Sequence, residues 1–488
     1  MKTSFKLLLT LMLFFVCANQ SIAQIRLPKI IGGNMVLQRN QALPIWGWAV
    51  PGKQVTVKFS GQLKSVVAGT DGYWKVLLNP LAANDKPQNM VIKSDTSTVT
   101  LNNILIGEVW LGGGQSNMEY VMKRHSGYTK PAKGIDSAEL ELSVHNPQIR
   151  LFLVEKKLSL PDVTTKYGWH EAEGVALEEF SAPGYYFAKQ LYNALHVPIG
   201  IIASSWGGSR IEPWTPFSAY AALPAFKNDI AAKADTLDGS VVGNFYKSMI
   251  EPLAPFAMHG FIWYQGESNC MINEPGMRYA DKMQALINSW RKVWGSPKMS
   301  FYSVLIAPYL YTKRKDHVPH TAETLPDFWE QQQASVAIPY TEAISVTDLV
   351  DDPGNIHPSY KWEVGRRLAL VALAKDYGIK RITYSGPRYK TMQVNGSKAV
   401  INFIYADGLK TSDSQPVNNF DIAGEDGVFF PATAEIKGNT VVLFNPDVKK
   451  PVTVRFAWAE TAEPNLVNSA GFPAFPFRTN AKKWDYVK

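Results

Sequence analysis

The sequence predicts an α/β fold, a parallel sheet with helices on both faces, flanked on each side by a β-sandwich-like region. Residues 24–105 and 381–488 show short runs in which apolar and polar residues alternate, as in half-buried strands. Residues 106–380 instead alternate short apolar runs with helical periodicity. A length of 488 residues exceeds what a single hydrophobic core usually supports, so two or three domains are expected. The changes of pattern divide the chain into three domains with these bounds.

The two flanking regions show no helical period. Near the N-terminus, Val55, Val57 and Phe59 alternate with polar neighbours, and glycines separate the short runs. In the C-terminal region, Asn395-Gly396 is a dipeptide typical of a hairpin turn. The strand candidates there are Lys398 to Phe403, Thr440 to Phe444 and Val452 to Trp458.

The central region supplies the strands and helices of the predicted sheet. Its strand candidates are Ile104 to Leu111, Pro198 to Ser204, Phe261 to Tyr264, Phe301 to Ala307 and Ala343 to Val346. Its helix candidates are Tyr185 to Leu195, Tyr279 to Val293 and Lys361 to Tyr377, the last stopped by Gly378. Such alternation predicts a parallel sheet covered on both faces. The stretch from about 120 to 180 is less regular and is expected to cap this region.

The first 23 residues have the composition of a secretory signal peptide. Lys2 and Lys6 precede an apolar run from Leu7 to Ala18, and Ser21 and Ala23 place small residues before a cut after Ala23. The run is short for a membrane span, and no later stretch reaches 18 consecutive apolar residues. We therefore expect an exported protein, periplasmic or extracellular, with no transmembrane segment in the mature chain.

Composition and motifs argue against several kinds of partner. Removal of residues 1–23 lowers the formal net charge from +8 to +6, and the basic residues are scattered, so no nucleic-acid partner is expected. Cys270 is then the only cysteine, which leaves no internal disulfide. The sequence has no His-Glu-x-x-His motif, cysteine pair, Walker loop or Gly-x-Gly-x-x-Gly fingerprint, so neither a metal nor a cofactor is expected.

Four polar segments follow strand candidates of the central region, and ligands of such sheets bind beyond the carboxyl ends of the strands. In the first, Gly112-Gly113-Gly114 permits a tight turn, after which Ser116 would be exposed at the start of a helix. Ser116 is either a nucleophile or only a helix N-cap, and this segment alone does not decide between them.

The second and third segments contain groups suited to an ester substrate. A glycine such as Gly208 can offer its backbone N–H to an oxyanion, and the side-chain amide of Gln265 or Asn269 can do the same. Arg210 could bind a carboxylate or form a surface ion pair. Glu267 could orient a base or satisfy buried backbone groups. Each segment, taken alone, is more often a plain turn without a chemical role.

The fourth segment, Asp351 to Pro358, links the last strand candidate to the following helix. Among the eight histidines, only His357 lies in a loop rich in proline and glycine after a strand of the α/β region. A neutral imidazole there could take the proton of Ser116 as a general base. A lone histidine is more often structural, so this assignment depends on its neighbours in space.

Together these segments resemble the SGNH hydrolases, and within them the sialate O-acetylesterases. The resemblance rests on Gly114-Gln115-Ser116-Asn117-Met118, Gly207-Gly208, Gln265-Gly266-Glu267-Ser268, and Ile356-His357-Pro358 followed by Val364-Gly365-Arg366-Arg367-Leu368. The flanking regions are also similar, at Gly424-Glu425-Asp426-Gly427 and Phe475-Pro476-Phe477-Arg478-Thr479. The likeness covers nearly the whole chain after residue 23, and the combination is more specific than any one segment.

The resemblance implies a flavodoxin-like α/β domain and a serine esterase that removes O-acetyl groups from sialic acid or a related sugar without a metal. Ser116 would attack the acetyl carbonyl while His357 takes its proton. The oxyanion would meet the backbone N–H groups of Ser116 and Gly208 and the amide of Gln265. We assign substrate binding to Arg210, Glu267 and Asn269.

One position departs from the family pattern. SGNH enzymes commonly place an aspartate three residues before the histidine, where this chain has Gly354. Asp352, Glu267 or a backbone carbonyl could orient His357 instead, and we assign this role to Asp352. A serine–histidine pair held by a carbonyl is the alternative.

Two other functions are compatible with the sequence. The same chemistry could act on acetylated xylan or pectin, and a non-catalytic glycan-binding protein could keep the fold. The binding protein would lack the nucleophile or the base, whereas Ser116 and His357 are both present. The 14 tryptophans suit a carbohydrate partner in each case.

Overall fold

A computed structural model of the chain describes residues 24–95, 97–123, 129–133, 140–232, 235–315 and 317–487. The predicted signal peptide, residues 1–23, lies outside the described residues. Within the described ranges, every helix is too short or too polar to span a membrane.

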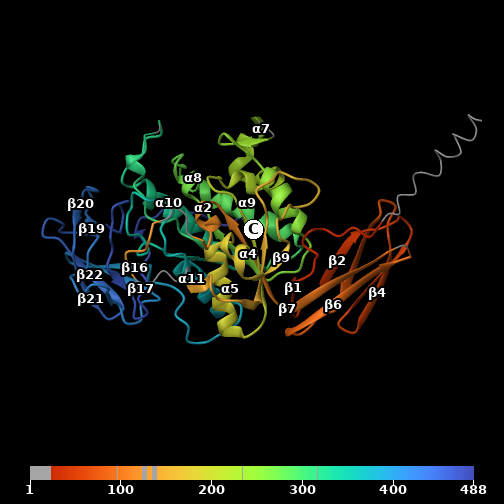
Figure 1. Cartoon of the computed structure of the whole chain (residues 1–488). Coiled ribbons are helices and arrows are strands. Elements are labelled where there is room, and N and C mark those ends of the chain that lie inside the picture. The colour runs from red at the N-terminus through yellow and green to blue at the C-terminus, as the bar shows by residue number, and fades with distance from the viewer. Residues whose placement is uncertain are drawn as a thin grey trace, which may run out of the picture.

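The central region forms a largely parallel sheet, as predicted. Its strands run in the spatial order β15-β14-β13-β7-β10-β8-β9, and only β9 at one edge is antiparallel to its neighbour. They are β7 (Thr98–Gly114), β8 (Asn146–Leu153), β9 (Trp169–Ala172), β10 (Ile199–Ser205), β13 (Gly260–Tyr264), β14 (Ser300–Val304) and β15 (Thr341–Ile344). Figure 1 shows this sheet and its helices between the two flanking β regions.

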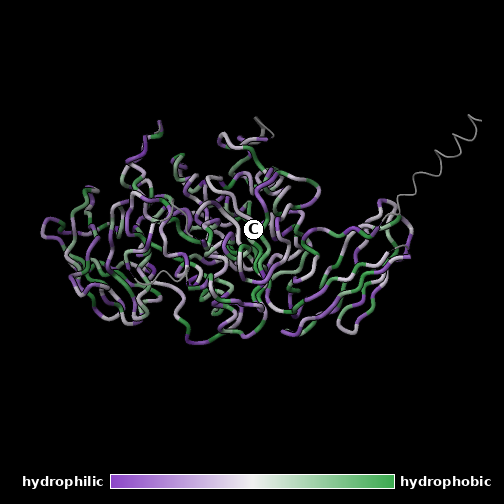
Figure 2. The backbone as a smooth tube through the Cα atoms, viewed as in Figure 1, coloured by the Kyte–Doolittle hydropathy of each residue, from purple (hydrophilic) through white to green (hydrophobic). Residues whose placement is uncertain are grey.

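Helices cover both faces of the sheet. On one face, α5 (Ala182–Leu195) and α11 (Lys361–Lys375) pack with Trp110 of β7. On the other, α9 (Arg278–Val293) and α10 (Thr324–Ala334) pack with Val109 and Leu111. Adjacent residues of a strand point to opposite faces, so one strand serves both cores. Figure 2 shows the apolar segments gathered in this part of the molecule.

The prediction that residues 120–180 only cap the α/β region was wrong, because this stretch contributes β8 to the sheet between β10 and β9. Its apolar run is interrupted by Arg150, a charged residue that the sequence pattern places in a loop. The guanidinium is 1% exposed, donates to the carbonyl of Pro147 at 2.7 Å and forms an ion pair with Glu171 at 3.2 Å. These buried partners allow a charge inside a strand.

Strand β7 joins the N-terminal region to the central sheet without a linker. Its first half pairs with β6 (Asn84–Ser94) and β1 (Val36–Gln38), and its second half pairs with β10 and β13. The predicted change at residue 106 therefore falls inside one strand, and a single apolar core runs through both regions. The other N-terminal strands are β2 (Leu43–Trp48), β3 (Gln54–Phe59), β4 (Gln62–Val67) and β5 (Tyr73–Leu78).

The C-terminal region contains two four-stranded antiparallel sheets around its own apolar core. The sheets have the orders β16-β17-β22-β21 and β20-β19-β23-β25, and the predicted Asn395-Gly396 hairpin joins β16 to β17. The strands are β16 (Arg388–Asn395), β17 (Lys398–Ile404), β19 (Phe420–Ala423), β20 (Phe429–Pro431), β21 (Thr433–Lys437), β22 (Thr440–Phe444), β23 (Thr453–Phe456) and β25 (Phe477–Arg478).

Short elements connect these layers. They are α2 (Ser116–Glu119), α4 (Gly174–Glu178), α6 (Phe217–Ala221), α7 (Lys227–Ala232) and α8 (Glu267–Cys270), with the strand pairs β11 (Thr236–Leu237) and β12 (Ser240–Val241), and β18 (Lys410–Thr411) and β24 (Leu466–Val467).

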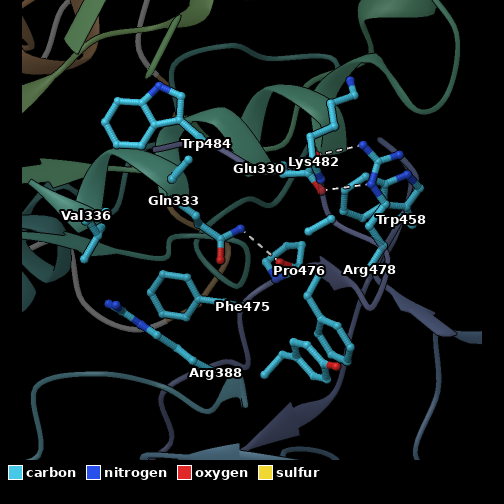
Figure 3. A pocket seen from close by; sticks show the side chains of 15 residues that line it. Glu330, Gln333, Val336, Arg388, Trp458, Phe475, Pro476, Arg478, Lys482 and Trp484 are labelled. Atoms are coloured by element: carbon cyan, nitrogen blue, oxygen red, sulfur yellow. Dashed lines mark hydrogen bonds and ion pairs between the residues drawn. The ribbon is translucent and has the colours of Figure 1, made fainter. Parts of the chain in front are cut away.

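The C-terminal region is attached to helix α10. Arg478 donates two hydrogen bonds to the carboxylate of Glu330, at 2.8 and 2.7 Å, and Gln333 donates to the carbonyl of Pro476 at 2.9 Å (Figure 3). The Arg478 guanidinium also lies over the ring of Trp458. These residues line a cavity of about 490 Å³ between the two regions. The planar, bidentate pairing of Arg478 with Glu330 fixes the direction of the contact as well as its distance. The C-terminal region therefore holds α10 at its outer side.

Helices α5 and α11 approach closely at Gly365. A Cβ at this position would lie 2.7 Å from each of three atoms of α5: the Phe187 nitrogen, the Pro183 oxygen and the Tyr186 Cβ. Two of these atoms are backbone, which cannot rotate away as a side chain does. The glycine therefore sets how closely α11 packs on α5.

Replacing Gly365 by alanine is expected to destabilise the protein. Alanine in a helix gains about 0.5–1 kcal/mol over glycine, but forced overpacking costs about 1–3 kcal/mol. The overpacking term wins because backbone atoms meet the new methyl group, so the midpoint of thermal unfolding should fall. Gly32→Ala is the matched control, since its nearest atom would lie at 3.9 Å. Equal midpoints for the two variants would contradict the expectation.

Candidate active site

Ser116 lies directly beyond the carboxyl end of β7. Gly112 and Gly113 continue the strand instead of forming the predicted turn, and the chain turns only at Gly114, whose φ is 143°. A Cβ on Gly114 would lie 2.1 Å from the carbonyl oxygen of Tyr264, so the close approach of β13 requires glycine there. Ser116 then begins α2, a single turn of four residues, and is partly exposed.

The structure brings His357 to Ser116. Nε2 of His357 lies 2.8 Å from Oγ of Ser116, although the two residues are 241 positions apart. His357 lies in the loop between β15 and α11, where its backbone N–H donates to Oδ1 of Asn355 at 3.0 Å. A hydroxyl hydrogen-bonded to an imidazole is the geometry of a base-activated nucleophile.

The surroundings of His357 favour the neutral imidazole. Burial lowers its pKa below the ordinary value, and the nearby Lys361 ammonium lowers it further. The carboxylate of Glu119 acts in the opposite direction, but it does not outweigh the other two causes. A neutral imidazole at neutral pH can accept a proton.

The structure shows no hydrogen bond between the Asp352 carboxylate and the His357 imidazole. The Asp352 carboxylate is exposed and accepts a hydrogen bond from the backbone N–H of Gly354 at 2.7 Å. The charged groups that act on the His357 pKa are Lys361 and Glu119, and Asp352 is not among them. The geometry therefore gives no support to the assignment of Asp352 as the orienting residue of His357. The Asp352 carboxylate instead accepts a hydrogen bond from Gly354 within its own turn.

The loop after β10 lies against Ser116. The N–H of Gly207 donates to the Glu119 carboxylate at 2.5 Å, and a Cβ on Gly207 would come within 3.4 Å of the Ser116 Cβ. Gly208 is exposed with a positive φ of 73°. Within the described residues, the backbone N–H groups of Ser116 and Gly208 donate to no protein acceptor. These two donors are the ones predicted for an oxyanion.

The side-chain amide of Gln265 does not occupy the position predicted for an oxyanion donor. Its side chain is fully buried, and its amide nitrogen donates within the protein to three acceptors. They are the side-chain oxygens of Gln115 at 3.2 Å and Asn269 at 2.8 Å, and the carbonyl of Ser209 at 3.2 Å. The predicted role of Gln265 as a third donor was therefore wrong for this geometry. The amide instead ties together the loops that follow β7, β10 and β13.

Arg210 and Asn269 belong to a buried polar network, contrary to their assignment to substrate binding. Arg210 is bonded to the carboxylate of Glu212, which is fully buried. The Asn269 amide, also fully buried, donates to Glu212 at 3.3 Å and to Glu274 at 2.6 Å. The Asn269 amide therefore holds the loops in place and does not face a ligand, whereas the Arg210 side chain, 15% exposed, is held by Glu212 at the edge of this network.

Glu267 is also fully buried, which removes it from the surface that a substrate could reach. Its Oε1 accepts a hydrogen bond from Nδ2 of Asn117 at 2.5 Å, and its Oε2 has no hydrogen-bond partner among the described residues. Burial raises its pKa, while Asn117 and the nearby Lys361 act to lower it. The assignment of Glu267 to substrate binding was therefore wrong, and its contact is with the residue that follows the nucleophile.

Lys361 completes this buried group and was missed by the sequence analysis. It is 2% exposed, and its ammonium donates to Oδ1 of Asn117 at 2.6 Å. The ammonium also lies over the rings of Tyr120 and Tyr264, at 4.9 and 5.3 Å. Burial lowers the pKa of Lys361 to about 7. A signal was present, because Lys361 occupies the apolar stripe of its helix together with Val364, Leu368 and Val371.

Glu119 was missed as well. Its carboxylate accepts the Gly207 N–H and the ammonium of Lys156, the latter at 2.6 Å. The spacing Ser116-x-x-Glu119 has the form of a capping box and could have drawn attention to it.

A cavity of about 450 Å³ lies beside α2, lined by Glu119 and by the strand ends at Leu153 and Ser205. Its wall also carries Lys156 and Lys166. The cavity lies beyond the carboxyl ends of β8 and β10, where ligands of such sheets bind.

Among the described residues, two groups of acidic side chains and histidine bring possible metal ligands together. In the first, Glu212, Asp238 and Glu274 surround the ammonium of Lys282 at 2.5 to 2.7 Å. The lysine supplies the positive charge that these carboxylates require.

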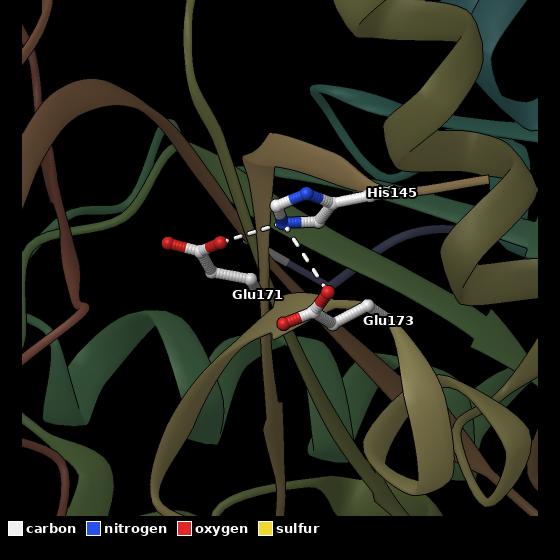
Figure 4. Close-up of side chains that lie close together, drawn as sticks. All are labelled: His145, Glu171 and Glu173. Carbon is white, nitrogen blue, oxygen red and sulfur yellow. Dashed lines mark hydrogen bonds and ion pairs between the residues drawn. The ribbon is translucent and has the colours of Figure 1, made fainter.

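The second group consists of His145, Glu171 and Glu173. Nε2 of His145 lies 2.7 Å from Glu171 and 3.5 Å from Glu173 (Figure 4). His145 directly precedes β8, so the group lies at the amino ends of the parallel strands, opposite to Ser116. The expectation of an esterase without a metal stays a prediction.

Comparison with known proteins identifies the family of the chain. The model of a family described as "Carbohydrate esterase, sialic acid-specific acetylesterase" matches residues 106–374. The sialate O-acetylesterase of Homo sapiens is 30% identical over 78% of this chain and 76% of its own length. That of Mus musculus is 26% identical over 89% of each chain. The crystal structure of a carbohydrate acetylesterase from Xanthomonas citri is 34% identical with a TM-score of 0.82, and covers 93% of this chain and 99% of its own.

The predicted SGNH-type sheet agrees with these neighbours, and the Ser116–His357 pair lies within the matched residues. The chain is a carboxylic ester hydrolase and belongs to the sialic acid-specific acetylesterase family of carbohydrate esterases.

Proposed function

We propose that this protein hydrolyses O-acetyl esters on sialic acid or a related sugar, with Ser116 as nucleophile and His357 as general base. The observation that carries the proposal is the 2.8 Å contact between the Ser116 hydroxyl and the His357 imidazole. Family membership supports the acetyl ester as the bond that is cleaved.

In the first step, Oγ of Ser116 bonds to the acetyl carbonyl carbon while Nε2 of His357 takes the hydroxyl proton. The tetrahedral intermediate collapses, the C–O bond to the sugar breaks, and His357 returns the proton to the departing sugar hydroxyl. In the second step, water attacks the acetyl-serine with His357 again as base, which releases acetate and restores Ser116.

The backbone N–H groups of Ser116 and Gly208 are the donors proposed for the oxyanion. Both are unused within the described residues, and Gly208 has no side chain to obstruct the approach. Gln265 contributes indirectly, since its amide fixes the loops around these donors. Preorganised donors of this kind are worth about 10²–10³ in rate for each group.

The cavity beside α2 is the proposed sugar site: it reaches Glu119, three residues after the nucleophile, although Ser116 and His357 do not themselves line it. Its volume of about 450 Å³ lies in the range of small-molecule sites. The proposal of sialic acid as the sugar rests on the family likeness. The alternative is an acetylated xylan or pectin, and a non-catalytic glycan-binding role is disfavoured because nucleophile and base are in contact.

Replacing Ser116 by alanine should abolish acetate release from O-acetylated sialic acid, with a loss of at least about 10³-fold in kcat. The reason is that no other hydroxyl is in contact with His357 among the described residues. Released acetate would be measured for wild type and variant, with acetylated xylan as the second substrate. Ser268→Ala is the matched control, a serine in the neighbouring short helix α8.

Activity on xylan alone would preserve the mechanism and change the substrate. If a folded wild-type protein released acetate from neither compound, the proposed function would be wrong. Full activity of Ser116→Ala would exclude Ser116 as the nucleophile.

The pH dependence of kcat/KM should reveal the titration of His357. Its pKa is lowered by burial and by Lys361, so the imidazole stays neutral to a lower pH than an ordinary histidine, whose pKa is about 6.5. Activity needs the neutral form, so the acidic limb of kcat/KM should have its midpoint below pH 6.5. A midpoint at or above pH 6.5 in an otherwise active enzyme would argue against His357 as the titrating base.

We also propose that the protein is exported and loses residues 1–23, as the charge and apolar pattern of that segment predicts. Protein recovered outside the cytoplasm of an expressing bacterial cell should begin at Gln24 by N-terminal sequencing. A chain that stays in the cytoplasm with Met1 intact would contradict this proposal.

A further inference from the structure

We propose that Asn117 is a positioning residue for the esterase reaction: its amide ties the His357 loop to the Ser116 turn, and Lys361 fixes the direction of that amide. The inference rests on the proposed function, since it concerns how the Ser116–His357 pair is held together. Neither the Asn117 nor the Lys361 side chain touches the reacting atoms as a nucleophile or base would.

Asn117 bridges the two catalytic segments directly. It follows Ser116 in the chain, and its Nδ2 donates to the backbone carbonyl of Ile356 at 3.0 Å. Ile356 in turn precedes His357. A single amide therefore joins the residue next to the nucleophile to the residue next to the base, across 239 positions of sequence. A shift of either segment would change the 2.8 Å distance between Oγ and Nε2.

The direction of the amide is fixed by charge. The two ends of an asparagine side chain have similar shape, so either end can face a neutral partner. Here the Glu267 carboxylate accepts from Nδ2 at 2.5 Å, and the Lys361 ammonium donates to Oδ1 at 2.6 Å. With Lys361 protonated and Glu267 ionised, the ammonium can only donate and the carboxylate can only accept. The reversed amide would lose both contacts and turn its oxygen toward the Ile356 carbonyl.

Burial gives this arrangement its stiffness. Asn117 and Glu267 are fully buried, and Lys361 is 2% exposed. Solvent therefore does not compensate for a lost partner, and a buried polar group without a partner costs about 1–3 kcal/mol. The amide is held at three points, by Glu267, Lys361 and the Ile356 carbonyl.

Lys361 has a second effect that distinguishes it from a purely structural residue. Its positive charge disfavours protonation of His357, which lies in the loop before α11, while the carboxylate of Glu119 in α2 acts in the opposite direction. Lys361 itself faces Glu267 from α8, Asn117 from α2, and the rings of Tyr120 and Tyr264. Loss of the lysine charge should therefore raise the pKa of the catalytic imidazole.

The first experiment removes the amide. Asn117→Ala deletes the tie, and Asn117→Asp keeps an oxygen for Lys361 while losing the N–H group that meets the Ile356 carbonyl. Both variants should lower kcat by about a hundredfold, the usual effect of a small misplacement of reacting groups, with KM within about twofold of wild type. A thermal melt of each variant shows whether it is folded.

The second experiment separates the hydrogen bond of Lys361 from its charge. Lys361→Gln keeps a donor for Oδ1 of Asn117 but no charge, so kcat should stay within a few fold of wild type while the acidic limb of kcat/KM moves to higher pH. Lys361→Met loses both functions and should show the same limb shift together with a fall of at least tenfold in kcat. Lys375→Gln, at a half-exposed position on the same helix, is the matched control and should show neither change.

A folded Asn117→Ala enzyme with kcat within twofold of wild type would overturn the inference. If Asn117→Ala does not fold, Lys361→Gln and Lys361→Met decide, and equal kcat values with no shift of the acidic limb would also overturn it. Wild-type acetate release is measured in the same assay. Its absence would defeat the proposed function, whereas its presence with insensitive variants would defeat only the role of Asn117 and Lys361.

Discussion

The site depends on the register of three parallel strands. Gly114 at the end of β7 pairs with Ser205 of β10 on one side and with Tyr264 of β13 on the other. The three strands therefore end at the same level, and the loops that follow them must share one small volume. Only a residue without a Cβ fits between β7 and β13 at that point, because the Tyr264 carbonyl lies 2.1 Å from where the atom would be. Close strand ends are what allow Ser116, Gly208 and the Gln265 loop to meet.

Charge deep in the protein then holds these loops without entering the reaction. The Gln265 amide links three loops, and Lys282 neutralises the carboxylates beneath Asn269. From the outer side, Gln332 of α10 donates to the carbonyl of Gln265 at 3.3 Å, and α10 is in turn bonded to the C-terminal region through Glu330. Helix α10 thus contacts both the C-terminal region and the floor of the site.

Periodicity was sufficient to predict the parallel sheet, its helices on both faces and the loops that carry Ser116 and His357. It could not predict β8, because Arg150 interrupts the apolar pattern and its buried partners come from distant segments. It also could not show which polar residues after a strand point toward a substrate. Gln265, Glu267 and Asn269 follow strands as ligand-binding residues do, yet all three are fully buried, and Arg210 is held by Glu212.

That outcome has a physical cause. A loop that must hold a serine and a histidine at hydrogen-bond distance needs more polar contacts beneath it than on its surface, because backbone groups at a strand end lose their sheet partners. Polar side chains near an active site are therefore needed first for hydrogen bonds that hold the loop, and only then for contacts with the ligand. Lys361 illustrates this order: a cation on the apolar stripe of α11 is costly by itself, and it is tolerated because it fixes the amide beside the nucleophile. Lys361 and Glu267 are the buried charged residues whose hydrogen bonds reach the side chain that follows the nucleophile.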